Sequence, residues 1–185
     1  IDDDDIAAVV AVLTSEYLTT GPAVDAFEAK LKDITGAEHA VACANGTAAL
    51  HLAALVLELK PNECVVVPSV TFLATANAAH YVGAEVIFAD VDANTGLMGP
   101  DHLEDALTRA DGRVRAVFPV HLGGRFVDMP EIAKIAQRNG LAVVEDACHA
   151  LGGSVCEGSS WFAAGSCRHA DMATFSFHPV KTVTM

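Results

Sequence analysis

A lysine near the C-terminal end of the sequence has the surroundings that covalent chemistry requires. Lys181 follows the stretch FSFHPV at 175–180, which contains no other Lys, Arg, Asp or Glu. Desolvation favours the neutral, nucleophilic amine of a lysine, which is how lysines that form Schiff bases are prepared. The alternative is a solvated loop lysine, as most lysines are, and this stretch alone does not decide between the two.

A carboxylate and an imidazole follow another apolar run. Asp146 comes after the strand-like residues 141–144, and His149 lies three residues further along. A carboxylate at the mouth of a sheet can keep the nitrogen of a pyridine ring protonated, so that the ring accepts electron density when a bond at a bound amine's carbon breaks. His149 could reach the phenolic oxygen of the same ring. The plainer alternatives are a helix cap for Asp146 and a buried, hydrogen-bonded imidazole for His149.

The turn ANGTAAL at 44–50 combines small residues, a hydroxyl and the expected start of a helix. Unpaired backbone N–H groups and the helix dipole make such a start suitable for a phosphate. A tight turn without a ligand is the alternative, since such turns are common. The glycine patterns of dinucleotide and nucleoside triphosphate sites are absent from this turn, which disfavours those ligands.

Apolar runs of strand length alternate with segments of helical spacing. The expected strands are residues 40–43, 64–67, 85–88, 114–118, 142–144 and 172–175. The expected helices are residues 24–35, 47–59, 71–82, 101–109 and 130–139. This alternation predicts an α/β fold, in which a mostly parallel sheet lies between two layers of helices and ligands bind beyond the carboxyl ends of the strands. The Gly- and Ser-rich residues 152–168 are expected to form an irregular connection.

Composition and charge limit the partners. With 24 acidic and 11 basic residues the formal net charge is −13, which makes nucleic acid and anionic membranes poor partners. No run of about 18 apolar residues occurs and the acidic start has no signal-peptide features, so a cytoplasmic protein is expected. The 5 cysteines form no CxxC pair, so neither a disulfide framework nor a metal site is expected.

In order and spacing, these features resemble one family. The matching stretches are residues 18–22, 45–50, 68–77, 83–92, 119–124, 145–152 and 176–181, which span nearly the whole chain. They are similar to the DegT/DnrJ/EryC1/StrS sugar aminotransferases, which belong to the fold type I enzymes that depend on pyridoxal 5′-phosphate (PLP). The wording HPVKT at 178–182 most resembles the branch that makes UDP-4-amino-4,6-dideoxy-N-acetyl-altrosamine for pseudaminic acid.

The resemblance implies a set of site residues. Those expected at the cofactor are Gly46, Thr47, Ala48, Phe72, Asp146, His149, Ser176 and Lys181. Lys181 would carry PLP as a Schiff base, and Asp146 would pair with the pyridine nitrogen. The phosphate would bind the helix start at 46–48 and Ser176, while Phe72 would stack on the ring and His149 would lie near the ring oxygen. Those expected at the substrate are Thr19, Thr20, Gly21, Pro22 and His121.

The implied reaction is an amino transfer in two halves. An amino acid, for which L-glutamate is expected, gives its amino group to the cofactor, and a nucleotide-linked keto-sugar then receives it. Family dehydratases have a histidine in place of the lysine, so Lys181 favours transamination. The family also implies a homodimer with shared active sites. It further implies a helical segment at 1–20 before a PLP-binding large domain at 21–185, which would be incomplete at its C-terminal end and lack the smaller C-terminal domain.

Two other functions remain open. A lyase or desulfurase of the same fold would use the same lysine and aspartate, with Cys148 and Cys156 as available thiols. The stretches 19–22 and 71–77 resemble the sugar aminotransferases more than such enzymes. The third possibility is an inactive fragment that retains only the core of the fold.

Overall fold

The computed structural model describes residues 1–184, and its internal contacts divide the chain into two units, Ile1–Ala42 and a second unit that begins at Cys43. The first unit contains α1 (Asp3–Leu13) and α2 (Pro22–Thr35). Asp2 caps α1 by accepting from the N–H groups of Asp4 and Asp5. The helical start predicted for residues 1–20 contains α1, whereas the boundary predicted after residue 20 stays a prediction.

The strand predicted at residues 40–43 is wrong. These residues lie between α2 and α3, and no strand is assigned to them. The backbone N–H of Ala42 donates to Glu28 Oε1 at 2.7 Å instead of to a neighbouring strand, and the side chain of Val41 is 81% exposed. An apolar run forms a strand only where a partner strand and a buried face are available. None of the described strands pairs with residues 40–43, and Val41 and Cys43 are exposed.

The second unit contains a sheet of five parallel strands in the order β2-β1-β3-β4-β7. Its strands are β1 (Cys64–Pro68), β2 (Glu85–Ala89), β3 (Val114–Val117), β4 (Ala142–Asp146) and β7 (Met172–Thr174). Its helices are α3 (Gly46–Val56), α4 (Leu73–Tyr81), α5 (Pro100–Arg109) and α6 (Met129–Asn139). The five remaining predicted strands and the five predicted helices are thus confirmed within a few residues.

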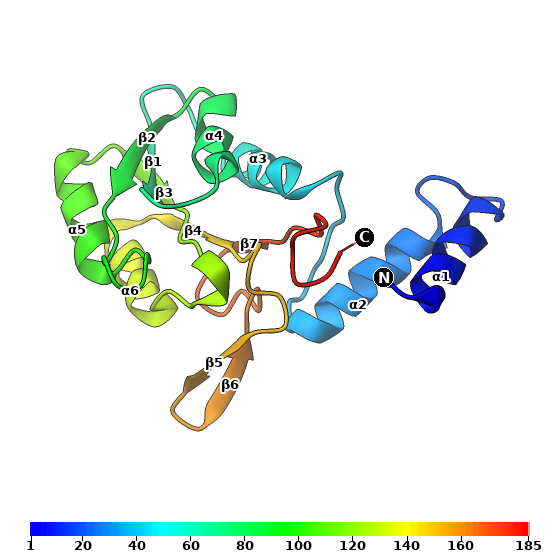
Figure 1. The fold of residues 1–185 in the computed structure, drawn as a ribbon. Coiled ribbons are helices and arrows are strands. Elements are labelled where there is room, and N and C mark those ends of the chain that lie inside the picture. The colour runs from blue at the N-terminus through cyan, green and yellow to red at the C-terminus, as the bar shows by residue number, and fades with distance from the viewer. Residues whose placement is uncertain (185) are drawn as a thin grey trace. The chain divides into compact units, whose positions relative to one another are not determined.

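Helices cover both faces of this sheet, as Figure 1 shows. Side chains of β1 alternate between the faces: Val65 and Val67 pack with α3 and α4, whereas Cys64 and Val66 pack with α5 and α6. Both sets are buried, which explains why the strands read as continuous apolar runs. The three-layer α/β/α architecture predicted from the sequence is confirmed.

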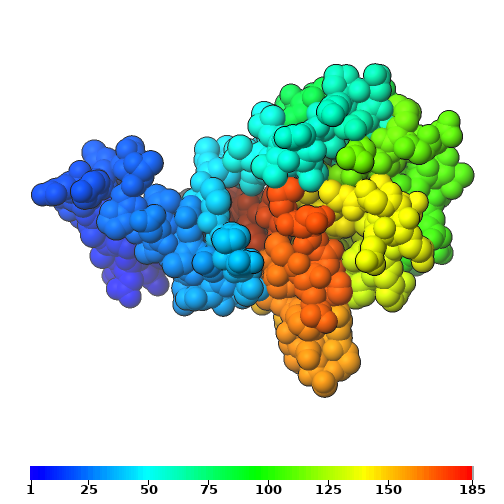
Figure 2. Space-filling model, turned by 180° about the vertical axis from the view of Figure 1, so that it is seen from behind, coloured from blue at the N-terminus to red at the C-terminus, as the bar shows by residue number. Residues whose placement is uncertain are grey.

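A hairpin interrupts the predicted irregular connection. Strands β5 (Ser154–Glu157) and β6 (Ser160–Ala163) pair in antiparallel fashion, and they project from the rest of the second unit as the orange segment of Figure 2. Gly158 begins the turn with φ +61°, a conformation that glycine adopts easily. The prediction that residues 152–168 are irregular is therefore wrong at these eight paired positions.

The strand order identifies the edge of the sheet where a ligand would bind. The chain passes from β1 to β2 on one side and then crosses to β3 on the other side of β1. Ligands of open α/β sheets bind at the carboxyl ends of the strands near such a reversal. None of the described helices is long and apolar enough to cross a membrane.

Candidate active site

The end of β4 places two consecutive carboxylates on opposite faces of the sheet. Successive side chains of a strand alternate, so Val143 packs on the α5 and α6 face and Val144 on the α3 and α4 face. Glu145 and Asp146 continue this alternation. Asp146 therefore faces α4, while Glu145 lies on the opposite side of the sheet.

Asp146 is buried and held by two donors. Its Oδ2 accepts from the hydroxyl of Thr75 at 2.7 Å, and its Oδ1 accepts from the backbone N–H of Cys148 at 3.2 Å. Only 4% of the residue is exposed. Each carboxylate oxygen can accept two hydrogen bonds, so both retain capacity for a ligand. The helix-cap reading of Asp146 is wrong, because no described helix begins with this residue as its cap.

The start of α3 lies against the residue that follows β7. A Cβ atom built on Gly46 would be 2.9 Å from Ser176 Cβ, which only glycine avoids. Asn45 caps the helix by accepting from Ala48 N–H at 2.9 Å, and within the described chain the N–H groups of Gly46 and Thr47 have no partner. The free donors and the Ser176 hydroxyl form a cradle with the chemistry that a phosphate needs.

Lys181 is half-buried. Its ammonium group acts on the titration of both Cys148 and His149, which places the three side chains within electrostatic reach of one another. Burial first, and then the charge of Asp146, raises the pKa of the Cys148 thiol well above its usual range. The thiol is therefore protonated at neutral pH and is a poor nucleophile.

The turn at Leu122–Gly124 orients His149. The N–H of Gly123 donates to His149 Nδ1 at 3.2 Å, so the proton of the neutral ring lies on Nε2. Gly123 has φ +61°, which places its N–H in this position at no steric cost. Burial first, and then Lys181, lowers the pKa of His149. The imidazole is thus a neutral donor through Nε2 at pH 7.

His121 lies deeper than the prediction that it lines the substrate cleft implied. It is 1% exposed, its Nδ1 accepts from Val127 N–H at 3.2 Å, and its Nε2 lies 3.0 Å from Glu145 Oε1. The same Glu145 oxygen accepts from Gly165 N–H at 2.8 Å. Both ring nitrogens of His121 are used inside the protein. Glu145 and Thr75 have no local sequence signal, because their partners lie far away in the sequence.

The other predicted residues lie in two places. Phe72 precedes α4 and is 68% exposed, so its ring is available to a ligand. Thr19, Thr20, Gly21 and Pro22 belong to the first unit, at and before the start of α2. Within residues 1–184, no group of three or more His, Cys, Asp or Glu side chains could hold a metal ion.

The site fits a phosphorylated pyridine. Ser176 and the start of α3 offer donors to a phosphate, Asp146 offers a buried carboxylate to a ring nitrogen, and Lys181 offers an amine. The Thr174 hydroxyl, opposite Asp146 in the β4–β7 pair, is buried with no partner in the part of the chain that the structure describes. On an α/β/α sheet this combination is that of the fold type I PLP-dependent enzymes.

The chain belongs to the DegT/DnrJ/EryC1/StrS aminotransferase family, which it matches over residues 1–185. This confirms the family predicted from the sequence. The enzymes of this family depend on PLP, and a neighbour has been solved in its PLP and PMP forms, so the predicted cofactor of the family is also confirmed.

Solved structures of aminotransferases share the fold. A Streptococcus pneumoniae protein described as a sugar aminotransferase is 32% identical with a TM-score of 0.89, and the match covers 100% of this chain and 48% of that one. DesV of S. venezuelae, solved with a ketimine intermediate, is 34% identical with a TM-score of 0.87 over 98% of this chain and 46% of its own. Helicobacter pylori PseC, an aminotransferase of pseudaminic acid biosynthesis, is 29% identical with a TM-score of 0.88 over 100% and 47%. The chain thus spans about half the length of these structures.

Proposed function

We propose that the protein is a PLP-dependent aminotransferase that moves an amino group from an amino acid to a nucleotide-linked keto-sugar. The donor we propose is L-glutamate, and the product is an amino sugar for cell-surface polysaccharides. The observation that carries the proposal is Asp146, a buried carboxylate with spare acceptor capacity at the carboxyl end of β4. Membership of an aminotransferase family supports it.

When bound, PLP supplies a conjugated ring that withdraws electron density from the carbon of an attached amine. The residues of this chain make that chemistry effective. Asp146 would hold a proton on the ring nitrogen. Lys181 would hold the cofactor through its amine and would move a proton to and from the amine-bearing carbon of the substrate.

Binding and orientation fall to the surrounding residues. Gly46, Thr47, Ala48 and Ser176 would hold the phosphate, and of the three helix N–H groups that of Ala48 is already engaged by Asn45. The exposed ring of Phe72 would stack on the cofactor, which excludes water from that face. His149 would donate from Nε2 to the ring oxygen, since its Nδ1 is occupied by Gly123.

The substrate would meet a different set of residues. We propose that Thr19, Thr20, Gly21 and Pro22 approach the sugar nucleotide, because this segment matches the family. His121 would act on the substrate side by fixing the turn 122–124, since its carbonyl oxygen accepts from the N–H of Gly124 while its ring is held by Glu145 and Val127. A homodimer with shared sites would supply the remaining contacts. The likeness to PseC supports a substrate of the pseudaminic acid type.

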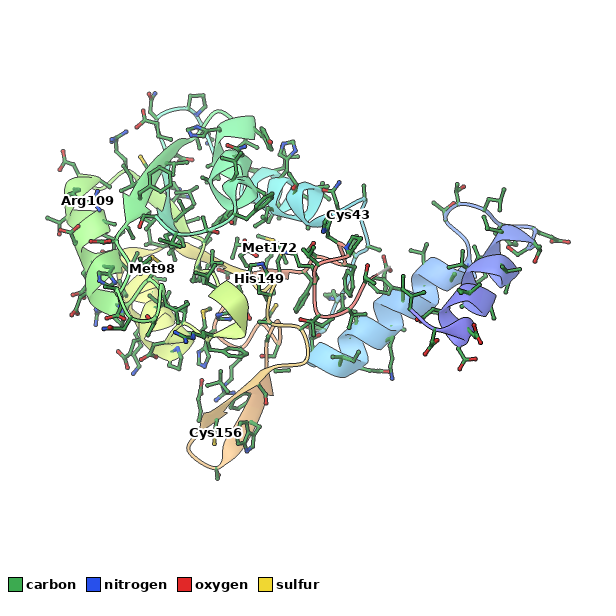
Figure 3. All side chains as sticks on the ribbon, viewed as in Figure 1. Cys43, Met98, Arg109, His149, Cys156 and Met172 are labelled. Atoms are coloured by element: carbon green, nitrogen blue, oxygen red, sulfur yellow. The ribbon has the colours of Figure 1, made fainter. Side chains whose placement is uncertain are left out.

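The desulfurase alternative has little support in the positions of the thiols. Cys148 is close to Lys181, but the raised pKa of its thiol leaves almost no thiolate for attack on sulfur. Cys156 lies on the β5–β6 hairpin, well away from His149 in Figure 3. Neither thiol combines reactivity with access to the lysine.

The test is a transfer assay. The protein with PLP, L-glutamate and a UDP-linked 4-keto-hexose is expected to release 2-oxoglutarate and form the amino sugar, and Lys181→Ala is expected to abolish both. Release of alanine from cysteine without amino transfer would instead support the desulfurase. Failure to bind PLP, with a folded circular dichroism spectrum, would support the inactive fragment.

A further inference from the structure

A pair of threonine hydroxyls connects Asp146 to the first turn of α4. Thr75 is 0% exposed, and its Oγ1 lies 2.7 Å from Asp146 Oδ2. The Oγ1 atoms of Thr75 and Thr71 are 2.9 Å apart. Thr71 is half-buried, so the chain of hydroxyls runs from the partly exposed β1–α4 connection to the buried carboxylate.

The direction of these hydrogen bonds follows from counting protons. An ionised carboxylate only accepts, so the single hydroxyl proton of Thr75 is donated to Asp146. Thr75 must then accept from the hydroxyl of Thr71. Donation by Thr71 polarises the Thr75 hydroxyl and strengthens the bond to the charged oxygen.

Threonine hydroxyls within helices ordinarily bond a carbonyl of the preceding turn. Three other threonines of this chain do so, with oxygen–oxygen distances of 2.9, 2.8 and 3.0 Å: Thr14 to Val10, Thr35 to Leu31 and Thr108 to Glu104. Thr75 departs from this pattern, because its hydroxyl is directed at Asp146, 71 positions away in the sequence. Its hydroxyl therefore does more than complete a helix turn.

The same residue is attached to Phe72. The backbone N–H of Thr75 donates to the carbonyl oxygen of Phe72 at 3.1 Å, which closes the first turn of α4. Thr75 thus connects the carboxylate at the end of β4 to the residue that we place on the face of the cofactor ring. A shift of one would be transmitted to the other through Thr75, whose side chain bonds Asp146 and whose backbone N–H bonds Phe72.

We propose that Thr75 is a positioning residue for the PLP ring. Its hydroxyl holds the carboxylate of Asp146 in place, and its backbone N–H ties that carboxylate to Phe72. Thr71 supports Thr75 by donating to its hydroxyl. This inference rests on the proposed function, because it concerns how the same site holds its cofactor. Thr75 would act through Asp146 and Phe72.

The test is a double-mutant cycle on PLP affinity, measured by fluorescence titration of the protein. Thr75→Val keeps the shape of the side chain and removes the hydroxyl, so we expect PLP to bind roughly 10-fold more weakly, as for a lost hydrogen bond to a charged group. Thr75→Ser restores the donor and is expected to stay within about 3-fold of the parent. In a protein that carries Asp146→Asn, Thr75→Val should change the affinity by less than about 2-fold, since its effect acts through the carboxylate.

A second variant leaves the buried position intact. Thr71→Val removes only the donor to Thr75, and we expect a smaller loss of about 3-fold in PLP affinity with an unchanged thermal midpoint. The inference is overturned if Thr75→Val binds PLP as the parent does, if its loss is equal in the Asp146→Asn protein, or if Thr75→Ser fails to restore binding. If the parent binds PLP and transfers amino groups, any of these results overturns only the role of Thr75. If the parent binds no PLP, the proposed function is overturned as well.

Discussion

The two carboxylates that end β4 have opposite surroundings. Glu145 is 6% exposed, and its Oε1 accepts two hydrogen bonds from protein groups, the ring of His121 and the N–H of Gly165. Asp146 is 4% exposed, and it accepts one bond on each oxygen, from Thr75 and Cys148. One carboxylate joins segments of the protein to one another, while the other keeps acceptor capacity on both oxygens and lies on the face of the sheet that α4 covers.

This difference shows that burial alone does not distinguish the carboxylate that we propose for the cofactor from one that only joins segments of the protein. Both residues are nearly inaccessible, and both are hydrogen-bonded, as buried charges must be. The two carboxylates differ in the groups that surround their hydrogen-bond partners. Glu145 leads to His121 and from there to Val127, whereas Asp146 lies within electrostatic reach of Cys148 and His149, the residues that Lys181 also influences.

The largest expected effect is on catalysis. Asp146→Asn keeps the shape and an acceptor but removes the charge that, in our proposal, holds a proton on the ring nitrogen, so kcat/KM for amino transfer should fall by about 10³-fold. The free energy of unfolding, measured with urea, should change by less than about 1.5 kcal/mol, since the Asn oxygen and amide can still bond Thr75 and Cys148. Comparable losses for Glu145→Gln would remove the distinction between the two carboxylates.

The second effect is on stability. Glu145→Ala leaves the His121 Nε2–H and the Gly165 N–H buried without an acceptor, which should cost about 2–5 kcal/mol of unfolding free energy in a urea titration. Glu145→Gln, which still offers an oxygen, should lose less than half of that amount. Equal losses for both variants would mean that the charge, rather than the hydrogen bonds, matters at this position.

The third effect concerns the phosphate cradle that Ser176 and the start of α3 form. Gly46→Ala places a methyl group 2.9 Å from Ser176 Cβ, so one of the two segments must move apart. We expect PLP affinity to fall about 10-fold by equilibrium dialysis, as when one or two charged hydrogen bonds are misplaced. As a control, Gly46→Ala should change the urea midpoint of a Glu145→Gln protein no more than it changes that of the parent. Position 46 and Glu145 lie on opposite faces of the sheet, so their effects should be independent.

The smallest effect concerns His149. Its pKa is lowered from 6.5, first by burial and then by Lys181, against a smaller opposing contribution of Asp146. The unfolded chain therefore takes up the proton at a higher pH than the folded one, so stability is complete above about pH 6.5 and falls as the pH drops through the lower folded pKa. Solvent screening keeps the loss under about 1 kcal/mol.

The comparison protein for this measurement is His149→Gln, which does not titrate and can still accept from Gly123. The difference in urea midpoint between the parent and this variant should shrink or change sign between pH 7.5 and pH 5. A constant difference across that range would contradict the lowered pKa.

The sequence predicts the five parallel strands better than it predicts residues 40–43 and the β5–β6 hairpin. Strands such as Cys64–Pro68 and Glu85–Ala89 follow from apolar runs bounded by turns, and their burial in a parallel sheet explains the pattern. The run at 40–43 is also apolar, but none of the described strands pairs with it. Whether a segment finds a partner strand depends on the whole fold and does not follow from the residues of that segment alone. The hairpin was detectable, because Gly158-Ser159 between two four-residue segments is a hairpin signal.

The candidate site was predictable where residues are close in sequence. Gly46 and Thr47 at a helix start, and Asp146 after an apolar run, follow from local rules. Their grouping required the family resemblance. Thr75 and Glu145 could not be predicted, because their roles depend on contacts between residues that are far apart in the sequence, such as the one that joins Thr75 to Asp146. No local signal distinguishes Thr75 from any other helical threonine.

The alternation of side chains along β4 has a consequence for how the strand must be built. Its period is two, so a slip by a single residue in the pairing with β3 and β7 would exchange the faces of Glu145 and Asp146. The acidic pair would then present the longer side chain to α4 and withdraw the shorter one from Thr75. An insertion or deletion of one residue between α6 and β4 is thus expected to be tolerated only where the loop, and not the strand, absorbs it.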